Sequence, residues 1–477
     1  MGTAAILIIF YNLFVLFYFI AINGFYLLLV LISYRGLRTR RKAEQATDRY
    51  QVFRSEFYKP LSIIIPSYNE EKTITETVNS ALSLRYPEFE VIIVNDGSKD
   101  NTLGVLKEKF NLSISARDYS LDIPCKTIRG TYSSADYPNL VVVDKENGGK
   151  SDALNAGINT SHFPIFCNID SDSLIDADSL LKVVDLFARD WRTVAAGGTI
   201  RPANHSRIED GKVTAIRLSP NFWVRFQIVE YIRAFLFGRT GWSVLRGLMI
   251  LSGAFSIFRR RAVVEAGGYR VDTVGEDMEL ALRLQRVMKK LNREYRVVFL
   301  PDPVCWTQVP EDYRGLQTQR RRWQRGLAES LFGNFEMFLN PQYGTTGMIS
   351  YPFFLFFEFL GPIIEITGYL VFIISVATGL LNPPFVLLFL TAAILLGILL
   401  SASALLMEEI FYRSYPRLRD LLVLFGFAVL ENFFYRQLHS WWRFRGILDF
   451  LFRKRGWGVL ARYSFAETPE KQEKTGG

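Results

Sequence analysis

The sequence predicts an α/β domain with a mostly parallel sheet, and α-helical transmembrane and interfacial segments on either side of it. Between residues 61 and 312, short runs rich in Val and Ile alternate with helical patterns. Residues 4–34 carry no charge, and two further apolar blocks occupy 349–378 and 385–407. The 477 residues, 49% of them hydrophobic, suffice for one large soluble domain and several membrane helices.

The first segment, residues 1–34, is predicted to be a transmembrane helix. Its uncharged stretch exceeds the roughly 20 residues that span a bilayer, and no small-residue cleavage site follows it, which disfavours a removed signal peptide. Five basic residues come next: Arg35, Arg38, Arg40, Arg41 and Lys42. The positive-inside rule then places the following domain in the cytoplasm of a multi-pass protein of the cell (inner) membrane. Residues 35–60 are expected to form a basic juxtamembrane linker.

Residues 346–408 are predicted to form a transmembrane hairpin, because Asn382-Pro383-Pro384 make a turn between two apolar blocks and arginines flank both ends. Interfacial helices are expected at 313–345, and interfacial or re-entrant helices at 409–465. The run at 421–435 is short, contains Glu431 and has basic residues on both sides, which favours the interface over a span. Three spans result, and the polar residues 466–477 are expected to be a disordered tail.

Within the predicted cytoplasmic domain, residues 61–312, four apolar runs are predicted to be buried parallel strands. They are 61–65, 91–95, 140–143 and 165–169, with helical patterns at 71–84, 101–110, 150–160 and 177–189. Polar residues follow each run, at the carboxyl edge of the sheet where ligands of open α/β sheets bind. These are Pro66-Ser67-Tyr68-Asn69-Glu70, Asp96-Gly97-Ser98, Gly148-Gly149-Lys150 and Asp170-Ser171-Asp172.

Several classes of function are disfavoured. The net charge of +9 comes from basic residues beside the apolar segments, as membrane orientation requires, so no nucleic-acid partner is expected. Three Cys and three His, all widely spaced, form no zinc pattern and no disulfide framework. Because no G-x-G-x-x-G or G-x-x-x-x-G-K-[ST] motif occurs, a dinucleotide cofactor and a phosphate-cradling NTPase loop are unexpected. Carboxylates must therefore carry any proton transfer.

Three carboxylates and one basic-aromatic cluster are candidates for chemistry. Asp170 and Asp172 flank one residue at a strand end, where they could hold Mg²⁺ or Mn²⁺ or could cap a turn. Asp277 begins a helical run, so it is a candidate general base or a charge that stabilises the helix terminus. Residues 319–323, Gln-Arg-Arg-Arg-Trp, offer guanidinium groups for a diphosphate and an indole for a sugar ring. Such residues are also common beside membrane spans.

Residues 61 to about 330 resemble the membrane-bound family 2 glycosyltransferases, namely the cellulose, chitin, hyaluronan and poly-N-acetylglucosamine synthases. The resemblance rests on an ordered set of short motifs. They are Pro66-Ser67-Tyr68-Asn69-Glu70, Asp96-Gly97-Ser98, Gly149-Lys150, Asp170-Ser171-Asp172, Ser252-Gly253-Ala254, Gly275-Glu276-Asp277 and Gln319-x-x-Arg322-Trp323.

The resemblance implies a nucleotide-sugar-binding domain of the GT-A type and a role for each matching residue. Pro66, Tyr68, Glu70, Asp96, Lys150, Asp170 and Arg322 would bind the nucleotide-sugar. Asp172, with Asp170, would hold Mg²⁺ or Mn²⁺, and Asp277 would be the catalytic base. Ser252, Gly253, Gln319 and Trp323 would contact the acceptor.

The resemblance thus implies an inverting hexosyltransferase that moves a sugar from a UDP-sugar to a growing polysaccharide, coupled to export. The alternative is transfer of one sugar to a membrane lipid, and a further alternative is an inactive assembly subunit. Two features depart from the family. Residues 112–139 form a long loop between two strands, and three spans are few for a polymer channel. A homo-oligomer or an export partner is therefore part of the prediction.

Overall fold

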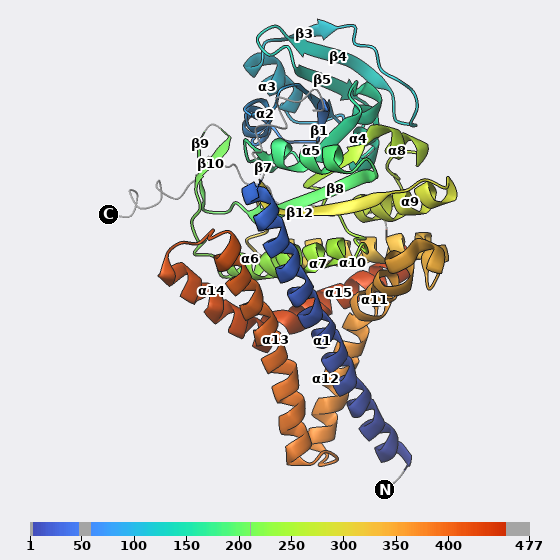
Figure 1. The fold of residues 1–477 in the computed structure, drawn as a ribbon, viewed down its shortest axis with the longest axis vertical. Coiled ribbons are helices and arrows are strands. Elements are labelled where there is room, and N and C mark those ends of the chain that lie inside the picture. Colours follow the sequence, from blue (N-terminus) through green and yellow to red (C-terminus); the bar gives the residue numbers. More distant parts are fainter. Residues whose placement is uncertain (1–2, 47–58, 210, 455–477) are drawn as a thin grey trace.

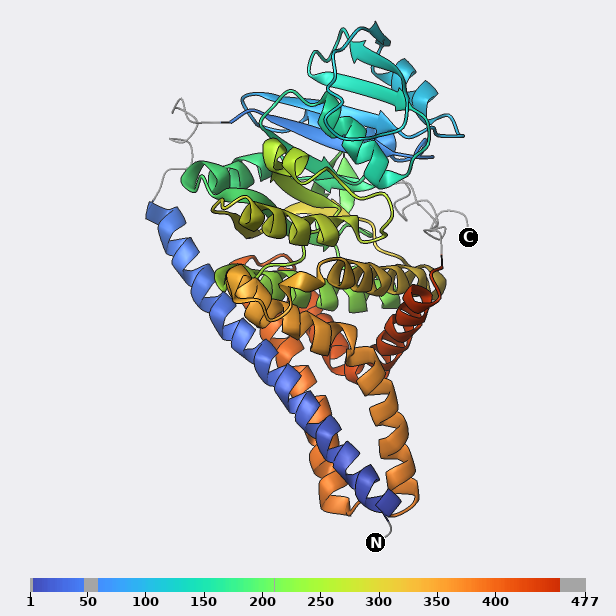
Figure 2. The same ribbon diagram turned by 90° about the vertical axis from the view of Figure 1, so that its right-hand side faces the viewer.

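A computed structural model describes residues 3–46, 59–209 and 211–454, and it places a ten-stranded sheet above a layer of helices and a bundle of long apolar helices (Figures 1 and 2). The four predicted strands are neighbours at the centre of this sheet, in the order β5-β2-β1-β6. They are β1 (Leu61–Ser67), β2 (Phe89–Asn95), β5 (Leu140–Lys145) and β6 (Ile165–Ile169). Their pairings are all parallel, so their carboxyl ends meet at one edge.

The sheet as a whole is mixed rather than mostly parallel, because six further strands extend it on both sides. Beyond β5 lie β4 (Ile128–Ser134) and β3 (Leu112–Ser115), both antiparallel to their neighbours. Beyond β6 lie β11 (Phe255–Arg259), β8 (Thr193–Pro202), β12 (Arg296–Thr307) and β7 (Ser173–Ile175), with β8 and β12 parallel. The predicted loop at 112–139 thus contains two strands, which the sequence conceals because they are polar and half-exposed.

The helices predicted after the central strands all form and cover the two faces of the sheet (Figure 1). They are α2 (Ile74–Leu82), α3 (Thr102–Lys109), α4 (Lys150–Thr160) and α5 (Ser179–Arg189). Two more helices, α8 (Arg260–Glu265) and α9 (Glu276–Lys290), follow β11, and a small hairpin pairs β9 (Arg207–Glu209) with β10 (Lys212–Ala215).

The first helix does not end at residue 34, where the linker was predicted to begin. Helix α1 (Thr3–Ala46) has 44 residues, and at about 1.5 Å per residue it is about 66 Å long, twice the hydrocarbon thickness. Its basic continuation consists of good helix formers such as Arg, Leu and Lys. This end is tied to the sheet, since Arg40 lies 2.8 Å from the Asp302 carboxylate of β12. Residues 47–58 of the predicted linker, and the tail at 466–477, lie outside the described residues.

Within the described chain, two helices are long and apolar enough to cross a membrane, or three when a bent pair counts as one. The two are α1 and α13 (Pro383–Phe411). The bent pair combines residues 346–359 with α12 (Gly361–Ala377), at an angle of 41°. Residues 346–359 comprise η5 (Thr346–Ser350), α11 (Tyr351–Phe353) and η6 (Phe354–Phe359).

Proline explains the bend in this segment. Pro362 has no N–H, and its ring displaces the carbonyl four residues earlier, which belongs to Glu358. The displaced carbonyls of Glu358 and Phe359 accept hydrogen bonds from the side-chain amide of Gln324, each at 3.2 Å, and the Glu358 carbonyl also accepts one from Arg443. The bend is therefore held by side chains from helices outside the hairpin.

A layer of helices separates the sheet from the apolar bundle (Figure 2). It contains α6 (Phe222–Tyr231), η2 (Ile232–Arg239), α7 (Thr240–Val244), α10 (Tyr313–Gly333), η3 (Phe335–Met337) and η4 (Pro341–Tyr343). The last part of the described chain adds α14 (Leu418–Leu430), η7 (Glu431–Tyr435) and α15 (Arg436–Leu451). The predicted interfacial segments 313–345 and 409–465 thus begin with helices that pack beneath the sheet.

Helix α10 touches the turn before α9 backbone to backbone. A Cβ atom built on Gly326 of α10 would lie 2.7 Å from the Gly275 Cα, and one built on Gly275 would lie 2.7 Å from the Gly326 Cα. Three residues beyond Gly326, the Glu329 carboxylate accepts bonds from the Thr273 hydroxyl at 2.8 Å and the Val274 N–H at 2.9 Å. The turn that leads to Asp277 is therefore fixed directly against α10.

We expect Gly326→Ala to destabilise the protein by about 1–3 kcal/mol, because the new methyl group meets backbone atoms that cannot rotate away. Thermal unfolding of the purified protein measures this change. Gly333→Ala in the same helix is the matched control: its Cβ would meet only the Arg270 side chain at 3.7 Å, and alanine favours a helix. Equal melting temperatures for the two variants would contradict the close contact.

Candidate active site

One cavity of about 1510 Å³ extends from the carboxyl edge of the central strands, past α10, to the apolar helices below. All the site residues predicted from the sequence line this cavity: Pro66, Tyr68, Glu70, Asp96, Lys150, Asp170, Asp172, Ser252, Gly253, Asp277, Gln319, Arg322 and Trp323. Residues separated by more than two hundred positions in the sequence therefore share one space.

The loop after β1 is joined to the Asp170-Ser171-Asp172 turn by a buried carboxylate. Glu70 is 2% exposed and accepts hydrogen bonds from the hydroxyls of Thr73 at 2.9 Å and Ser171 at 2.8 Å. Pro66 is buried in β1 itself, whereas the Tyr68 ring is partly exposed at the mouth of the cavity. Glu70 thus holds two strand ends in register and leaves Tyr68 accessible.

Asp96 lines the cavity, but both of its carboxylate oxygens are bound within the next turn. One carboxylate oxygen accepts from the buried Lys145 ammonium at 2.6 Å and the Gly148 N–H at 2.9 Å, and the other accepts from the Gly149 N–H at 2.7 Å. Gly149 has φ of 88°, a conformation that side chains disfavour. Sequence reasoning missed Lys145. The signal that could have revealed it is its position as a charged residue at the end of an apolar strand. Asp96 therefore positions the turn from which Lys150 projects.

Lys150 begins α4 and neutralises two carboxylates in the cavity. Its ammonium nitrogen lies 2.6 Å from Asp170 Oδ1 and 3.1 Å from Glu276 Oε1. Although burial disfavours the charged form, these carboxylates raise the pKa of Lys150 above its ordinary value. Burial raises the pKa of Glu276, and the adjacent Asp277 adds to this effect. Sequence reasoning missed Glu276, although it belongs to the predicted Gly275-Glu276-Asp277 triplet.

Asp170 and Asp172 form a pair of like charges. Burial, and then the Asp170 charge, raise the pKa of Asp172 to about 6. Among the residues that the structure describes, no group of three or more His, Cys, Asp or Glu could hold a metal ion by itself. The pair nevertheless fits Mg²⁺ or Mn²⁺, because such ions take few carboxylates from the protein and complete their shell with substrate oxygens and water.

Asp277, the predicted base, lies in the first turn of α9 and is held by two backbone N–H groups. Its Oδ2 accepts from Gly253 at 2.8 Å, and its Oδ1 accepts from Met278 at 2.8 Å. A Cβ atom on Gly253 would lie 2.8 Å from the Lys150 ammonium nitrogen and 3.6 Å from Asp277 Oδ2. The predicted Ser252-Gly253 turn thus lies between Lys150 and Asp277, and a side chain at Gly253 would crowd the Lys150 ammonium.

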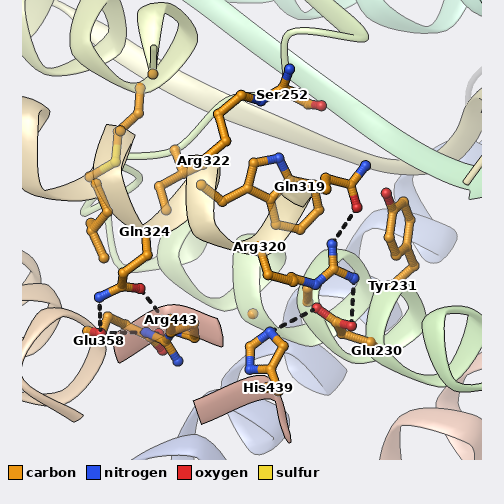
Figure 3. Close-up of a pocket in the computed structure, with 18 of the residues that line it drawn as sticks. Glu230, Tyr231, Ser252, Gln319, Arg320, Arg322, Gln324, Glu358, His439 and Arg443 are labelled. Atoms are coloured by element: carbon orange, nitrogen blue, oxygen red, sulfur yellow. Dashed lines mark hydrogen bonds and ion pairs between the residues drawn. The ribbon is translucent and has the colours of Figure 1, made fainter. Parts of the chain in front are cut away.

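The three arginines of the motif on α10 have different partners. Arg320 is 1% exposed and its guanidinium contacts Glu230 at 2.7 Å, while Arg321 binds both oxygens of Asp449 at 2.6–2.9 Å. Arg321 does not line the cavity. Arg320 and Arg322 both line the cavity with Gln319 and Trp323, and Figure 3 shows Arg320, Arg322 and Gln319 on α10. Because the Arg320 guanidinium is buried against Glu230, Arg322 remains the candidate of the predicted cluster for binding a diphosphate.

Below α10 the cavity is lined by polar and charged side chains that sequence reasoning did not assign to the site. They are Glu230, Arg233, Glu358, Glu365, Arg436, His439 and Arg443. Glu358 and Glu365 are seven residues apart in the sequence, and the bend at Leu360 places them in two helical segments. Both nevertheless face α15, since Glu358 pairs with Arg443 at 2.8 Å and Glu365 accepts from Ser440.

Arg239 in η2 is another cavity residue that sequence reasoning missed. It lines the cavity, and its guanidinium lies 3.9 Å from the centre of the Phe235 ring. One of its terminal nitrogens is buried and has no hydrogen-bond partner within the described chain. Burial lowers the pKa of Arg239 to about 10. No sequence motif marks this residue, whose position depends on a π-helical turn.

Two curated relatives show what the chain is similar to. The poly-beta-1,6-N-acetyl-D-glucosamine synthases of Staphylococcus aureus (strain COL) and Staphylococcus epidermidis are each 29% identical to it, over 276 and 275 residues. Each alignment covers 58% of this chain and 56% of the relative, so the chain spans only somewhat more than half the length of these proteins.

A solved structure supports the fold. A mannosyltransferase from Pyrobaculum calidifontis, in complex with GDP-Man and Mn²⁺, matches 92% of this chain and 100% of its own chain, with a TM-score of 0.50 and 18% identity. At this identity the match shows a shared fold and no more.

Two family profiles match the sequence directly. The one described as Glycosyl transferase family 2 matches residues 62–266, and the one described as Glycosyl transferase family group 2 matches residues 165–406. The second match covers just over half of the chain and includes α10, the bent segment and most of α13. The chain therefore belongs to the family 2 glycosyltransferases.

Proposed function

We propose that this protein is an inverting membrane glycosyltransferase that moves N-acetylglucosamine from UDP to a growing polysaccharide. One observation carries the proposal: every predicted donor, base and acceptor residue lines a single cavity that continues towards the apolar helices. The similarity to the two poly-beta-1,6-N-acetyl-D-glucosamine synthases supports the choice of sugar.

The donor would bind at the edge of the central strands. The accessible Tyr68 ring can stack on the uracil base, and Glu70 and Asp96 fix the two loops around it. Lys150 and Arg322 would face the diphosphate, where a planar guanidinium can bind two oxygens at once. The unpartnered nitrogen of Arg239 supplies a further donor for a substrate oxygen.

Asp172 and Asp170 would hold a divalent cation, Mg²⁺ or Mn²⁺. When bound, the cation would neutralise charge on the diphosphate and stabilise UDP as the leaving group. The Lys150 ammonium already compensates the Asp170 charge at 2.6 Å. Asp172, whose pKa is raised, is therefore the carboxylate whose charged form a cation would stabilise most.

Asp277 would act as the general base. An acceptor hydroxyl gives its proton to an Asp277 oxygen, its own oxygen bonds to the anomeric carbon, and the bond from that carbon to the UDP oxygen breaks with its electron pair. Attack from the side opposite UDP inverts the anomeric centre. The two N–H groups that bind Asp277 keep its oxygens in place for this transfer.

The acceptor would approach from the α10 side, with Trp323 stacking on a sugar ring and Gln319 bonding to its hydroxyls. We place the catalytic domain in the cytoplasm, because the basic residues of α1 and those around α10 lie on its side of the apolar helices. The lower cavity would then receive the product for export across the inner membrane, with a second copy or a partner subunit completing the passage.

A second function, transfer of one sugar to a membrane lipid, is favoured by the lower end of the cavity. There the lining is apolar and belongs to the membrane helices: Phe19, Phe372, Phe389, Leu390, Ile394 and Leu400. Such an apolar surface favours contact with an acyl or prenyl chain over contact with water.

Product size separates these two functions. Given labelled UDP-N-acetylglucosamine, membranes containing the protein are expected to yield a long, water-soluble polymer, measured by size-exclusion chromatography. Extraction of the label into organic solvent, with mass spectrometry showing a single added sugar, would instead identify a lipid acceptor.

Asp277→Asn is expected to lower turnover about 10²–10⁴-fold, because an amide cannot accept the acceptor proton. UDP release at saturating donor measures the change, and UDP affinity should remain that of the wild type. Asp272→Asn serves as the matched control, since this exposed carboxylate pairs with Arg270 and does not line the cavity. Wild-type turnover in Asp277→Asn would rule out its role as the base.

Asp172→Asn is expected to raise the Mn²⁺ concentration needed for half-maximal UDP release at least about tenfold, because a neutral amide binds a hard cation poorly. Electron paramagnetic resonance of Mn²⁺ with UDP measures binding without turnover. Asp178→Asn, which removes the half-buried carboxylate that pairs with the exposed Arg85 and does not line the cavity, should leave the Mn²⁺ requirement unchanged. An undiminished rate of the wild type in excess EDTA would contradict metal dependence.

A further inference from the structure

Arg320 occupies an unusual place in its motif. It is 1% exposed, although it lies between polar neighbours on α10. Its guanidinium donates to Gln319 Oε1 at 2.6 Å and to Glu230 Oε2 at 2.7 Å, and its central carbon lies 4.2 Å from the centre of the Trp323 ring. One planar group therefore contacts both Gln319 and Trp323, the two motif residues to which we assign acceptor binding. Figure 3 shows its bonds to Gln319 and Glu230.

We propose that Arg320 is a positioning residue that sets the orientation of Gln319 and Trp323 for the acceptor. The proposal rests on the proposed function in one respect only, namely that these two residues bind a sugar chain. The contacts that define the position of Arg320 are independent of which acceptor is used.

The anchor for Arg320 comes from two other helices. Glu230 of α6 accepts from Arg320 and, through the same oxygen, from the buried Tyr435 hydroxyl at 2.8 Å. Its second oxygen lies 3.6 Å from His439 Nε2 of α15. Although burial disfavours the carboxylate, Arg320 and these neighbours lower the pKa of Glu230 to about 2, so the pair stays ionised at neutral pH.

The geometry of α10 explains why Arg320 reaches both neighbours. Residues 320 and 323 are three apart, so their side chains meet on one helix face, and a guanidinium over an indole is a favourable cation–π contact. Arg320 also donates a hydrogen bond to the side-chain carbonyl oxygen of Gln319. The amide nitrogen of Gln319 is then the group that is left to donate to a sugar hydroxyl in the cavity.

Arg321 provides a contrast within the same helix. It also makes an ion pair with a distant helix, through both oxygens of Asp449 on α15, yet it contacts neither Gln319 nor Trp323 and does not line the cavity. A change at Arg321 should therefore weaken packing between α10 and α15 without altering the acceptor residues. This makes Arg321→Met the matched control for Arg320→Met.

The first experiment requires no turnover. The full-length protein is labelled with fluorotryptophan, and the signal of Trp323 among the eight tryptophans is assigned with Trp323→Phe. Arg320→Met should shift the Trp323 fluorine resonance, and Arg321→Met should not. An unshifted resonance in Arg320→Met, or equal shifts in both variants, overturns the proposal.

The second experiment uses UDP release with UDP-N-acetylglucosamine and a β-1,6-linked N-acetylglucosamine oligosaccharide. Arg320→Met should raise the KM for the oligosaccharide about tenfold, as expected for losing one positioned contact, and leave the KM for the donor unchanged. Arg320→Lys retains the charge but not the planar guanidinium, so its KM for the oligosaccharide should lie between those of Arg320→Met and the wild type. This conservative variant keeps the test valid if Arg320→Met does not fold. In a protein that already carries Trp323→Phe, Arg320→Met should raise the KM for the oligosaccharide by a smaller factor, because the effects of two coupled residues are not additive.

These outcomes also separate the two proposals. A wild-type protein that transfers no sugar from any UDP donor refutes the proposed function, and the fluorine spectra then decide the role of Arg320. An active wild type with equal rises in acceptor and donor KM for Arg320→Met refutes the positioning role and leaves the proposed function intact.

Discussion

The backbone contact between Gly275 and Gly326 is the constraint on which the site depends. At this point the turn carrying Asp277 and the helix carrying Trp323 approach so closely that neither position has room for a Cβ atom. The sheet carries the residues proposed to bind the donor, and α10, which lies outside the sheet, carries two of the residues proposed to bind the acceptor. Glu329 adds two hydrogen bonds to the same turn, so the separation between Asp277, the proposed base, and Trp323, a proposed acceptor residue, is set by packed backbone rather than by flexible side chains.

The same helix also connects the site with the membrane segments. Pro362 deprives its helix of a backbone hydrogen bond, and the carbonyls freed at the bend are bound by Gln324, the residue after Trp323, and by Arg443. In apolar surroundings an unsatisfied carbonyl is costly, so the bend and α10 stabilise each other. A shift of α10 would break these hydrogen bonds. The position of α10 beside the sheet is therefore coupled to the bend between residues 346–359 and α12.

The sequence predicts those parts whose signal is local. The four central strands were found because each is a run of Val and Ile, whereas β8, which contains Ala195, Ala196, Gly197 and Gly198, has no such run and is recognisable only from its burial in the sheet. The candidate site residues could be named because each follows a strand or belongs to a compact motif, and the structure places all of them in one cavity. The different roles of Arg320, Arg321 and Arg322 could not be predicted, since they depend on Glu230 and Asp449, which lie 90 and 128 residues away.

Charge balance below α10 limits which acceptors the cavity can take. Arg233 and Arg436 both bind the buried Glu431, and Arg443 binds Glu358 at 2.8 Å. A phosphate on a polyprenyl lipid at this level would compete with these carboxylates for the arginines, and a buried carboxylate that lost its arginine would cost about 3–5 kcal/mol. A neutral sugar chain exchanges hydrogen bonds with the same groups without separating any pair. If the proposed function holds, these ion pairs therefore suit a neutral, hydroxyl-rich acceptor better than a phosphate-bearing lipid, even though the lower end of the cavity is apolar.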